Sequence, residues 1–258
     1  MELIFSPSTI PSFNLAAEEY LFTTQKEYLF LYVNEPSVII GYNQAVVNEV
    51  DIDFCIENDI RIIRRLSGGG AVYHDSGNLN YSFISDKKDM PLSADFLLPV
   101  IHVLEKLDIP AEIRKRKDLW LPGGYKISGT ASHVSKGRVL HHGTLLYDSN
   151  LEHLQRSLNP EKRNIIAKAT ASVVSPVKNI SSFLVEKEKN VLSFQEFVDR
   201  FIDESVKYFG VSGLTSLTIT DVEAIDELRQ HKYSQREWNY KMWVRQTYME
   251  PSDTNNFP

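Results

Sequence analysis

Residues 60–84 read IRIIRRLSGGGAVYHDSGNLNYSFI, and this stretch says most about the fold. Residues 60–64 are rich in branched side chains that favour a β-strand, and three consecutive glycines follow shortly after them. More strand-forming residues, at 71–74 and 79–84, come next, so the glycines lie between strands and do not lead into a helix. Residues 75–78 have the composition of a turn, which predicts that the two later runs form an antiparallel hairpin.

Upstream of this stretch the pattern is helix, strand, strand and short helix. Asn14 is expected to cap a helix that runs through residues 15–21. Residues 28–33 and 37–40 are rich in β-formers, and a short acidic helix is expected near residues 51–58. Helices and strands therefore do not alternate strictly from the start of the chain.

Downstream, strands dominate the middle of the chain. Residues 97–107 predict a helix, and residues 125–134 with 138–147 predict a second hairpin that turns at 135–137. This mixture favours an α+β fold in which helices cover a mixed, mostly antiparallel sheet. We expect a single domain over the whole chain, residues 1–258.

Two capping boxes are expected near the C-terminus. Ser193 and Glu196 precede an amphipathic helix that Gly210 should end. Thr220 and Glu223 repeat the pattern before a last helix.

The composition is that of an ordinary globular protein, with 42% hydrophobic and 24% charged residues among 258. The formal net charge of −6 and the pI of about 5.7 argue against a nucleic-acid-binding protein, which needs a basic surface. Cys55 is the single cysteine, which excludes an intrachain disulfide and a cysteine-rich zinc site. No secretory signal and no membrane-spanning run is evident, so we expect a cytoplasmic protein.

The glycine-rich segment suits an anion. Glycines without side chains let backbone N–H groups approach a phosphate, and the guanidinium groups of Arg64 and Arg65 match phosphate oxygens. The segment matches neither of the two common nucleotide-binding fingerprints. A tight structural turn is the alternative interpretation of the glycines alone.

Lys126 is the strongest single candidate for chemistry. It lies on an expected strand and is followed by small residues, including Gly129 and Ala131, which leave space for a ligand. The hairpin expected here would bring Gly143 and Thr144 near it. A solvated surface lysine is the alternative.

His141 and His142 are adjacent in this hairpin. Neighbouring residues of a strand point to opposite faces, so a shared metal ion is not expected. A hydrogen-bonding or packing role is expected instead.

Three segments together resemble lipoate-protein ligases. They are R-R-x-S-G-G-G-A-V-[FY]-H-D at residues 64–75, K-x-S-G-x-A at 126–131 and H-H-G-T-L-L at 141–146, in matching order and spacing. Weaker similarities extend the resemblance over residues 14–179, and they lie at 14–19, 41–44, 158–160 and 172–173.

The resemblance implies a catalytic domain of the fold shared with biotin-protein ligases. It implies a two-step reaction in which ATP and Mg²⁺ convert lipoate to lipoyl-adenylate with release of pyrophosphate. The lipoyl group then passes to a lysine on an acceptor domain of a 2-oxoacid dehydrogenase or a glycine-cleavage protein.

The resemblance also implies residue roles. Lys126 would be catalytic, contacting the carboxylate and the α-phosphate and steadying developing charge. The residues implied for the nucleotide are Arg65, Gly70, Ala71, Val72, Tyr73, Asp118 and Lys126. Those implied for the lipoyl substrate are Gly68, Gly69, His74, Gly129, Ala131, His142, Gly143 and Thr144. No metal ligand is indicated.

Longer relatives carry an accessory domain after the catalytic one. Residues 191–258, which we assign to two helices and a strand, leave no room for it. In some short relatives activation requires a separate small subunit, so a partner of this kind stays open here.

Two other functions stay open. Lipoyl or octanoyl transferases share the fold and act without ATP through a cysteine thioester. Here only Cys55 is available, and its place in an amphipathic helix beside carboxylates favours a packing role. A non-catalytic lipoate-binding protein is the alternative from a different class.

Overall fold

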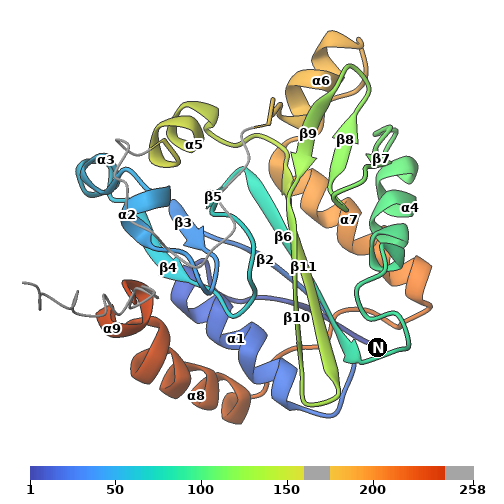
Figure 1. Cartoon of the computed structure of the whole chain (residues 1–258). Helices are drawn as coiled ribbons and strands as arrows, with labels where there is room; N and C mark the ends of the chain where they lie inside the picture. Colours follow the sequence, from blue (N-terminus) through green and yellow to red (C-terminus); the bar gives the residue numbers. More distant parts are fainter. Residues whose placement is uncertain (160–174, 242–258) are drawn as a thin grey trace, which may run out of the picture.

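The computed structural model describes residues 1–159 and 175–241. Its centre is a five-stranded sheet with strand order β1-β2-β6-β11-β10 (Figure 1). Only the β1–β2 pair is parallel, and the other three pairs of this sheet are antiparallel. The strand bounds are Glu2–Phe5 for β1, Tyr28–Val33 for β2, Asn78–Asp86 for β6, Thr130–Ser135 for β10 and Arg138–Leu146 for β11.

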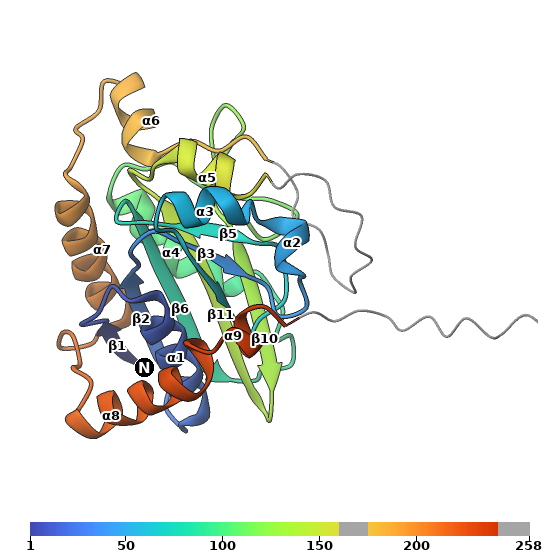
Figure 2. The same cartoon turned by 90° about the vertical axis from the view of Figure 1, so that its left-hand side faces the viewer.

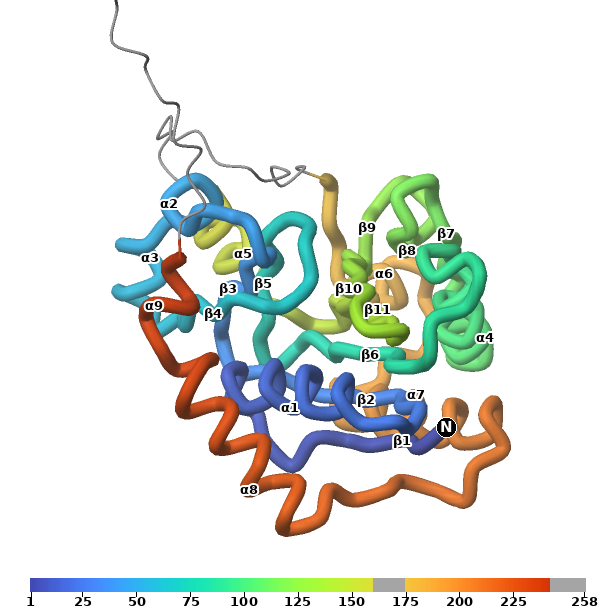
Figure 3. The backbone as a smooth tube through the Cα atoms, turned by 60° about the horizontal axis from the view of Figure 1, so that its bottom comes forward, coloured from blue at the N-terminus to red at the C-terminus, as the bar shows by residue number. Residues whose placement is uncertain are grey.

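Two three-stranded sheets flank the central one. The first has the order β4-β3-β5 and the second the order β7-β8-β9. Figure 3 shows them on opposite sides of the backbone trace. Their bounds are Ser37–Ile40 for β3, Arg61–Arg64 for β4, Val72–His74 for β5, Glu112–Ile113 for β7, Leu119–Leu121 for β8 and Tyr125–Ser128 for β9.

Helices cover both faces of the central sheet. One face packs on α1 (Pro11–Thr23), with α8 (Ile219–Leu228) on the outer side of α1, and the other packs on α4 (Leu98–Lys106) and α7 (Phe194–Phe209). Because successive side chains of a strand point to opposite faces, β2 buries alternate residues in each of these two cores. The α+β prediction of a mixed, mostly antiparallel sheet covered by helices is therefore confirmed.

The remaining helices are short. Helix α3 packs beside α5 against the outer face of the β4-β3-β5 sheet, and Figure 2 shows the two together. Among the described residues, no helix combines the length and apolarity that crossing a bilayer requires. The bounds are Val46–Glu49 for α2, Ile52–Glu57 for α3, Leu151–Ser157 for α5, Ile180–Glu186 for α6 and Arg236–Asn239 for α9, with single turns at Asp95–Leu97 and Arg229–Tyr233.

The hairpin expected over residues 71–84 is wrong. Strand β5 pairs with β3, whereas β6 pairs with β2 and β11 in the central sheet. The turn between them forms, but Gly77 lies directly against the backbone of Asp148, where an added Cβ would meet the carbonyl oxygen at 2.0 Å. This contact fixes the point where the chain crosses from one sheet to the other. Strand β6 is thereby placed between β2 and β11 and pairs with both.

The second hairpin is confirmed in part. Strands β10 and β11 pair antiparallel from Thr130↔Gly143 to Ser135↔Arg138. The expected single strand over residues 125–134 is interrupted at Gly129, because β9 pairs with β8 in a different sheet. Gly129 therefore lies where two sheets meet.

The capping predictions have mixed outcomes. Ser193 and Glu196 form the expected box, and Gly210 ends α7 with φ +62°. The second box is wrong by two residues, because Thr218 and Asp221 form it. An acidic residue of either length at this position can bond back to the N-cap amide.

Asn14 is not an N-cap. Helix α1 begins at Pro11, whose ring is suited to a first helical turn, and Asn14 lies inside that turn with a fully buried side chain.

Of residues 191–258, the described part to 241 contains helices and no strand. Residues 160 and 172–173, where two of the weaker similarities fall, lie outside the described residues.

Candidate active site

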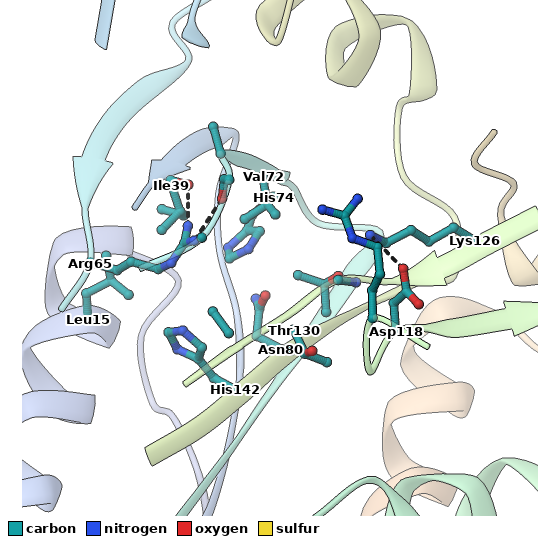
Figure 4. Close-up of a pocket in the computed structure, with 18 of the residues that line it drawn as sticks. Leu15, Ile39, Arg65, Val72, His74, Asn80, Asp118, Lys126, Thr130 and His142 are labelled. Atoms are coloured by element: carbon teal, nitrogen blue, oxygen red, sulfur yellow. Dashed lines mark hydrogen bonds and ion pairs between the residues drawn. The ribbon is translucent and has the colours of Figure 1, made fainter. Parts of the chain in front are cut away.

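A cavity of about 240 Å³ opens where the three sheets meet (Figure 4). Strands of the central sheet supply its floor, β3 and β5 supply one wall, and β9 supplies another. The lining residues are Leu15, Tyr32, Ile39, Arg65, Gly69, Gly70, Ala71, Val72, His74, Asn80, Arg116, Asp118, Lys126, Gly129, Thr130, Ala131, His142, Gly143 and Thr144.

Arg65 shapes the glycine turn from inside. Its Nη2 donates to the carbonyls of Gly68 at 2.6 Å and Gly70 at 2.7 Å, and its Nη1 donates to the carbonyl of Ile39 at 2.9 Å. With the bond from Nε to Ser67, these contacts use four of the five guanidinium N–H groups. Arg65 lines the cavity, but most of its N–H donors are already used in hydrogen bonds within the protein.

The turn also depends on two close backbone approaches. Gly69 has φ +88°, and a Cβ on Gly41 would meet the Gly69 carbonyl oxygen at 2.1 Å. Only glycine accommodates both features without strain.

Arg64 does not face the cavity, and the prediction that it binds phosphate is wrong. Its side chain is fully buried, and burial lowers its pKa to about 10. All of its guanidinium nitrogens donate to backbone carbonyls, at 2.7 to 3.0 Å. The six acceptors belong to Gly41, Tyr42, Gln44, Trp238, Asn239 and Lys241.

Lys126 and Asp118 form an ion pair at the edge of the cavity. Lys126 Nζ lies 3.3 Å from Asp118 Oδ2, and the side chains are 25% and 6% exposed. Within the described residues, the other oxygen of Asp118 is buried and has no hydrogen-bond partner. Arg116 also lines the cavity. The lining therefore contains the cations Arg116 and Lys126 and the carboxylate of Asp118, which favours an anionic ligand with hydroxyl or amino groups.

A buried hydrogen-bond relay of Glu18, His142 and Ser67 lies beside the cavity, which His142 lines. The Nδ1 of His142 lies 3.0 Å from both carboxylate oxygens of Glu18, and its Nε2 lies 2.6 Å from the hydroxyl of Ser67. Burial raises the pKa of Glu18, but His142 and hydrogen bonds from Ser82 and Tyr32 outweigh it, so the net pKa is lowered. Glu18 is therefore a carboxylate that orients His142.

This relay has the connectivity of a serine–histidine–carboxylate triad. Ser67 is fully buried, however, and its oxygen already accepts from Arg65 Nε at 2.9 Å. The hydroxyl therefore supports the cavity wall and is not an accessible nucleophile.

The two adjacent histidines point to opposite faces, as predicted. His141 contacts the hydroxyl of Ser132 at 2.7 Å and stacks on Phe96 with ring centroids 4.1 Å apart. His142 faces the cavity. Within residues 1–159 and 175–241, no group of three or more His, Cys, Asp or Glu side chains is arranged to hold a metal ion.

The cavity brings together most of the predicted site residues, with two exceptions. Tyr73 points to the opposite face of β5 and packs in the core beside α3 and α5, so only its backbone is near the site. Gly68 lies on the outer side of the turn. The residues that the sequence did not reveal are Leu15, Tyr32, Ile39, Asn80, Arg116 and Thr130.

Cys55 lies away from this cavity. It is buried in α3, and its pKa is raised to about 12 by burial and by the charge of Asp51. A thiol of this kind stays protonated at neutral pH and is a poor nucleophile. The packing role expected for Cys55 is confirmed, and a thioester mechanism has no cysteine at this site.

Comparison with known proteins decides the family. The model of the lipoyl protein ligase A/B catalytic domain matches residues 10–205. This chain belongs to that family. Lipoate-protein ligase LplJ of Bacillus subtilis is 39% identical over 237 residues, which cover 89% of this chain and 70% of LplJ. Lipoate–protein ligase 1 of Staphylococcus aureus is 37% identical over 239 residues, which cover 90% and 70%.

Solved structures of lipoate-protein ligases share the fold. The Ta0514 protein of T. acidophilum, a putative lipoate protein ligase with bound lipoic acid, is 28% identical with a TM-score of 0.76, covering 93% of this chain and 98% of that one. Lipoate-protein ligase A bound with ATP is 27% identical with a TM-score of 0.76, covering 94% and 99%. The bipartite ligase of Thermoplasma acidophilum, described with its E2 lipoyl domain, is 27% identical with a TM-score of 0.74, covering 96% and 99%.

Proposed function

We propose that this chain is an ATP-dependent lipoate-protein ligase. In the first step a carboxylate oxygen of lipoate attacks the α-phosphorus of ATP, and the bond to pyrophosphate breaks. In the second step the amine of an acceptor lysine attacks the acyl carbon, AMP leaves, and the amine loses a proton. The amide bond to the acceptor protein is the product.

Lys126 carries the proposal. Its ammonium lies in the same cavity as the glycine turn, where a carboxylate and a phosphate must meet. A cation there stabilises charge that develops on phosphorus in the first step and on the acyl oxygen in the second. Asp118 holds the ammonium at 3.3 Å, and its unpartnered oxygen is a suitable acceptor for a ribose hydroxyl or adenine amino group.

The other part of the cavity suits the tail of the acid. Leu15, Ile39 and Val72 present apolar surface there. An extended chain bound against these residues would have its carboxyl group toward Lys126 and Arg116.

Mg²⁺ would be held chiefly by the phosphates of ATP. It typically uses one or two carboxylates with phosphate oxygens, and Asp118 is the acidic residue that lines the cavity within the described part of the chain. Its chemistry would be to neutralise charge on the phosphates.

The acceptor is proposed to be a lipoyl domain of a 2-oxoacid dehydrogenase or a glycine-cleavage protein. The Thermoplasma ligase described with its E2 lipoyl domain supports this class of partner. We place the reaction in the cytoplasm, where ATP is available. Since that ligase is bipartite, a second subunit that assists adenylation is included in the proposal.

The test separates the two half-reactions. The pure chain is incubated with lipoate, ATP and Mg²⁺ and assayed for pyrophosphate and lipoyl-adenylate, and transfer is followed from supplied lipoyl-adenylate to a lipoyl domain. Lys126→Ala should slow both by at least about 10²-fold, as expected for loss of one preorganised donor. Lys106→Ala, which removes an exposed lysine at the end of α4, is the control. Normal rates for Lys126→Ala would refute the assignment.

A further inference from the structure

A chain of buried polar side chains ends on the imidazole of His74. Asn14 lies on α1, Asn34 follows β2, and His74 ends β5; they are 0%, 0% and 3% exposed. Asn14 Nδ2 lies 2.8 Å from Asn34 Oδ1, and Asn34 Nδ2 lies 2.9 Å from His74 Nδ1. Neither asparagine lines the cavity, so their contact with it runs through His74.

Backbone carbonyls set the direction of this chain. The Nδ2 of Asn14 also lies 2.9 Å from the carbonyl oxygen of Ser8 and 3.3 Å from that of Val33. A carbonyl can only accept, so the amide nitrogen of Asn14 must be on this side and must donate to Asn34 Oδ1. The NH₂ group of Asn34 is then directed at His74, whose Nδ1 accepts. The proton of the neutral ring is therefore on Nε2.

Within the described part of the chain, that Nε2–H is the unpaired donor of a ring that lines the cavity. Among the described residues, His74 Nε2 is buried without a hydrogen-bond partner, and His74 lines the cavity. Figure 4 shows the ring between the Arg65 side and the Lys126 side. Burial, with the nearby Arg65 and His142, lowers the pKa of His74 to about 3, so the ring is neutral at physiological pH. A buried donor without a partner is costly, and a ligand atom that accepts from it removes the cost.

We propose that Asn34 is a positioning residue that holds His74 in the Nε2–H tautomer, and that this N–H selects acids whose tail carries an acceptor atom, as the dithiolane sulfur of lipoate does. The inference rests on the proposed function. Sulfur is a weak, neutral acceptor, which suits a neutral donor. The carboxyl group belongs instead with Lys126 and Arg116. Octanoate has the same chain length but no sulfur, and it would leave the N–H unpaired.

The first experiment tests the donor. Binding of lipoate and octanoate is measured by calorimetry for the wild type, His74→Phe and His74→Gln. Because His74→Phe loses one neutral hydrogen bond to lipoate, this variant should bind lipoate about three- to tenfold more weakly than the wild type. Octanoate binding should change less than about twofold by the same reasoning. His74→Gln, whose amide can place an N–H near the position of Nε2, should keep the preference for lipoate. Equal losses for both acids would overturn the proposal.

The second experiment tests the positioning residue. ¹⁵N NMR of labelled histidine should show Nε2 protonated in the wild type. In Asn34→Asp the carboxylate accepts from Nδ1–H, and the preference for lipoate should follow the protonation of Nε2. The preference for lipoate is lost if the neutral ring of His74 carries its proton on Nδ1, and it is kept if the ring becomes an imidazolium with protons on both nitrogens. Asn179→Asp alters a buried asparagine outside the cavity lining and should leave the preference unchanged.

Three outcomes count against the inference: an unprotonated Nε2 in the wild type, a preference for lipoate that persists without Nε2–H, or loss of the preference in Asn179→Asp. If the wild type prefers lipoate as described but forms no adenylate, only the proposed function fails. If it binds neither acid, both fail.

Discussion

Replacing Arg64 by lysine should destabilise the protein strongly although the charge is kept. Arg64 offers five N–H donors to six backbone carbonyls, whereas an ammonium offers three. At least three carbonyls therefore lose their donor. At about 1 kcal/mol each, the low end for a buried group left unsatisfied, the loss is about 3 kcal/mol. Urea unfolding followed by circular dichroism measures this difference.

Arg61→Lys provides the matched control on the same strand. Its side chain is 59% exposed, and its Nε lies 3.3 Å from Oε1 of Glu35, whose side chain is 37% exposed. An exposed pair of this kind contributes at most about 1 kcal/mol, so this variant should differ little from the wild type. If Arg64→Lys unfolds at the same urea concentration as Arg61→Lys, the structural role assigned to Arg64 is wrong.

Arg64→Lys should also weaken binding of lipoyl-adenylate. One of the six carbonyls is that of Gly41, which lies directly against the Gly69 carbonyl of the glycine turn. Movement of residue 41 would be passed to the cavity wall. Calorimetry at a temperature where the variant is folded measures this effect, and unchanged affinity would show that the two loops are independent.

Two further predictions concern titratable groups. Folding raises the pKa of Cys55 from 9.0 to about 12, so the neutral thiol should react slowly with thiol reagents at pH 8 until urea unfolds the chain. Cys55→Ser should retain ligase activity. Rapid labelling of the native protein would contradict the first expectation. Folding lowers the pKa of His74 from 6.5 to about 3, so the unfolded chain binds the extra proton and stability should fall as the pH drops through this window. At pH 5 the contribution of His74 to this loss is about 2 kcal/mol (1.5 units at about 1.36 kcal/mol each). The loss between pH 7 and pH 5 should therefore be smaller by about this amount in His74→Phe, while the loss from His141, whose pKa burial lowers to about 4, remains.

The sequence predicts the fold class well because its signals are local. The S-x-x-E box at Ser193 and the turn at residues 135–137 depend on neighbours a few residues apart, and both are present in the structure. Strand pairing is different, since it depends on distant segments. The 71–74 and 79–84 runs were strands as predicted, yet β5 found its partner in β3, more than 30 residues earlier.

The site shows the same division. The glycine turn and Lys126 could be predicted because each is marked by its own short motif. Arg64 and Arg65 are chemically identical neighbours, yet Arg64 binds backbone carbonyls and Arg65 lines the cavity. The difference comes from the pleat of the strand, which points neighbouring side chains to opposite sides, and from the position of the C-terminal segment. Asn34 carried no signal, since its role depends on a contact with His74, 40 residues away.

The cavity lies at the meeting point of three sheets, which has a consequence for cooperativity. Tyr32 belongs to the central sheet, Val72 to the β4-β3-β5 sheet and Lys126 to the β7-β8-β9 sheet. A ligand that touches all three adds its binding free energy to every partial opening that would separate one sheet from the others. Occupancy of the site should therefore merge regions that open separately into one unit of hydrogen exchange, even though it creates no new bond between the sheets themselves.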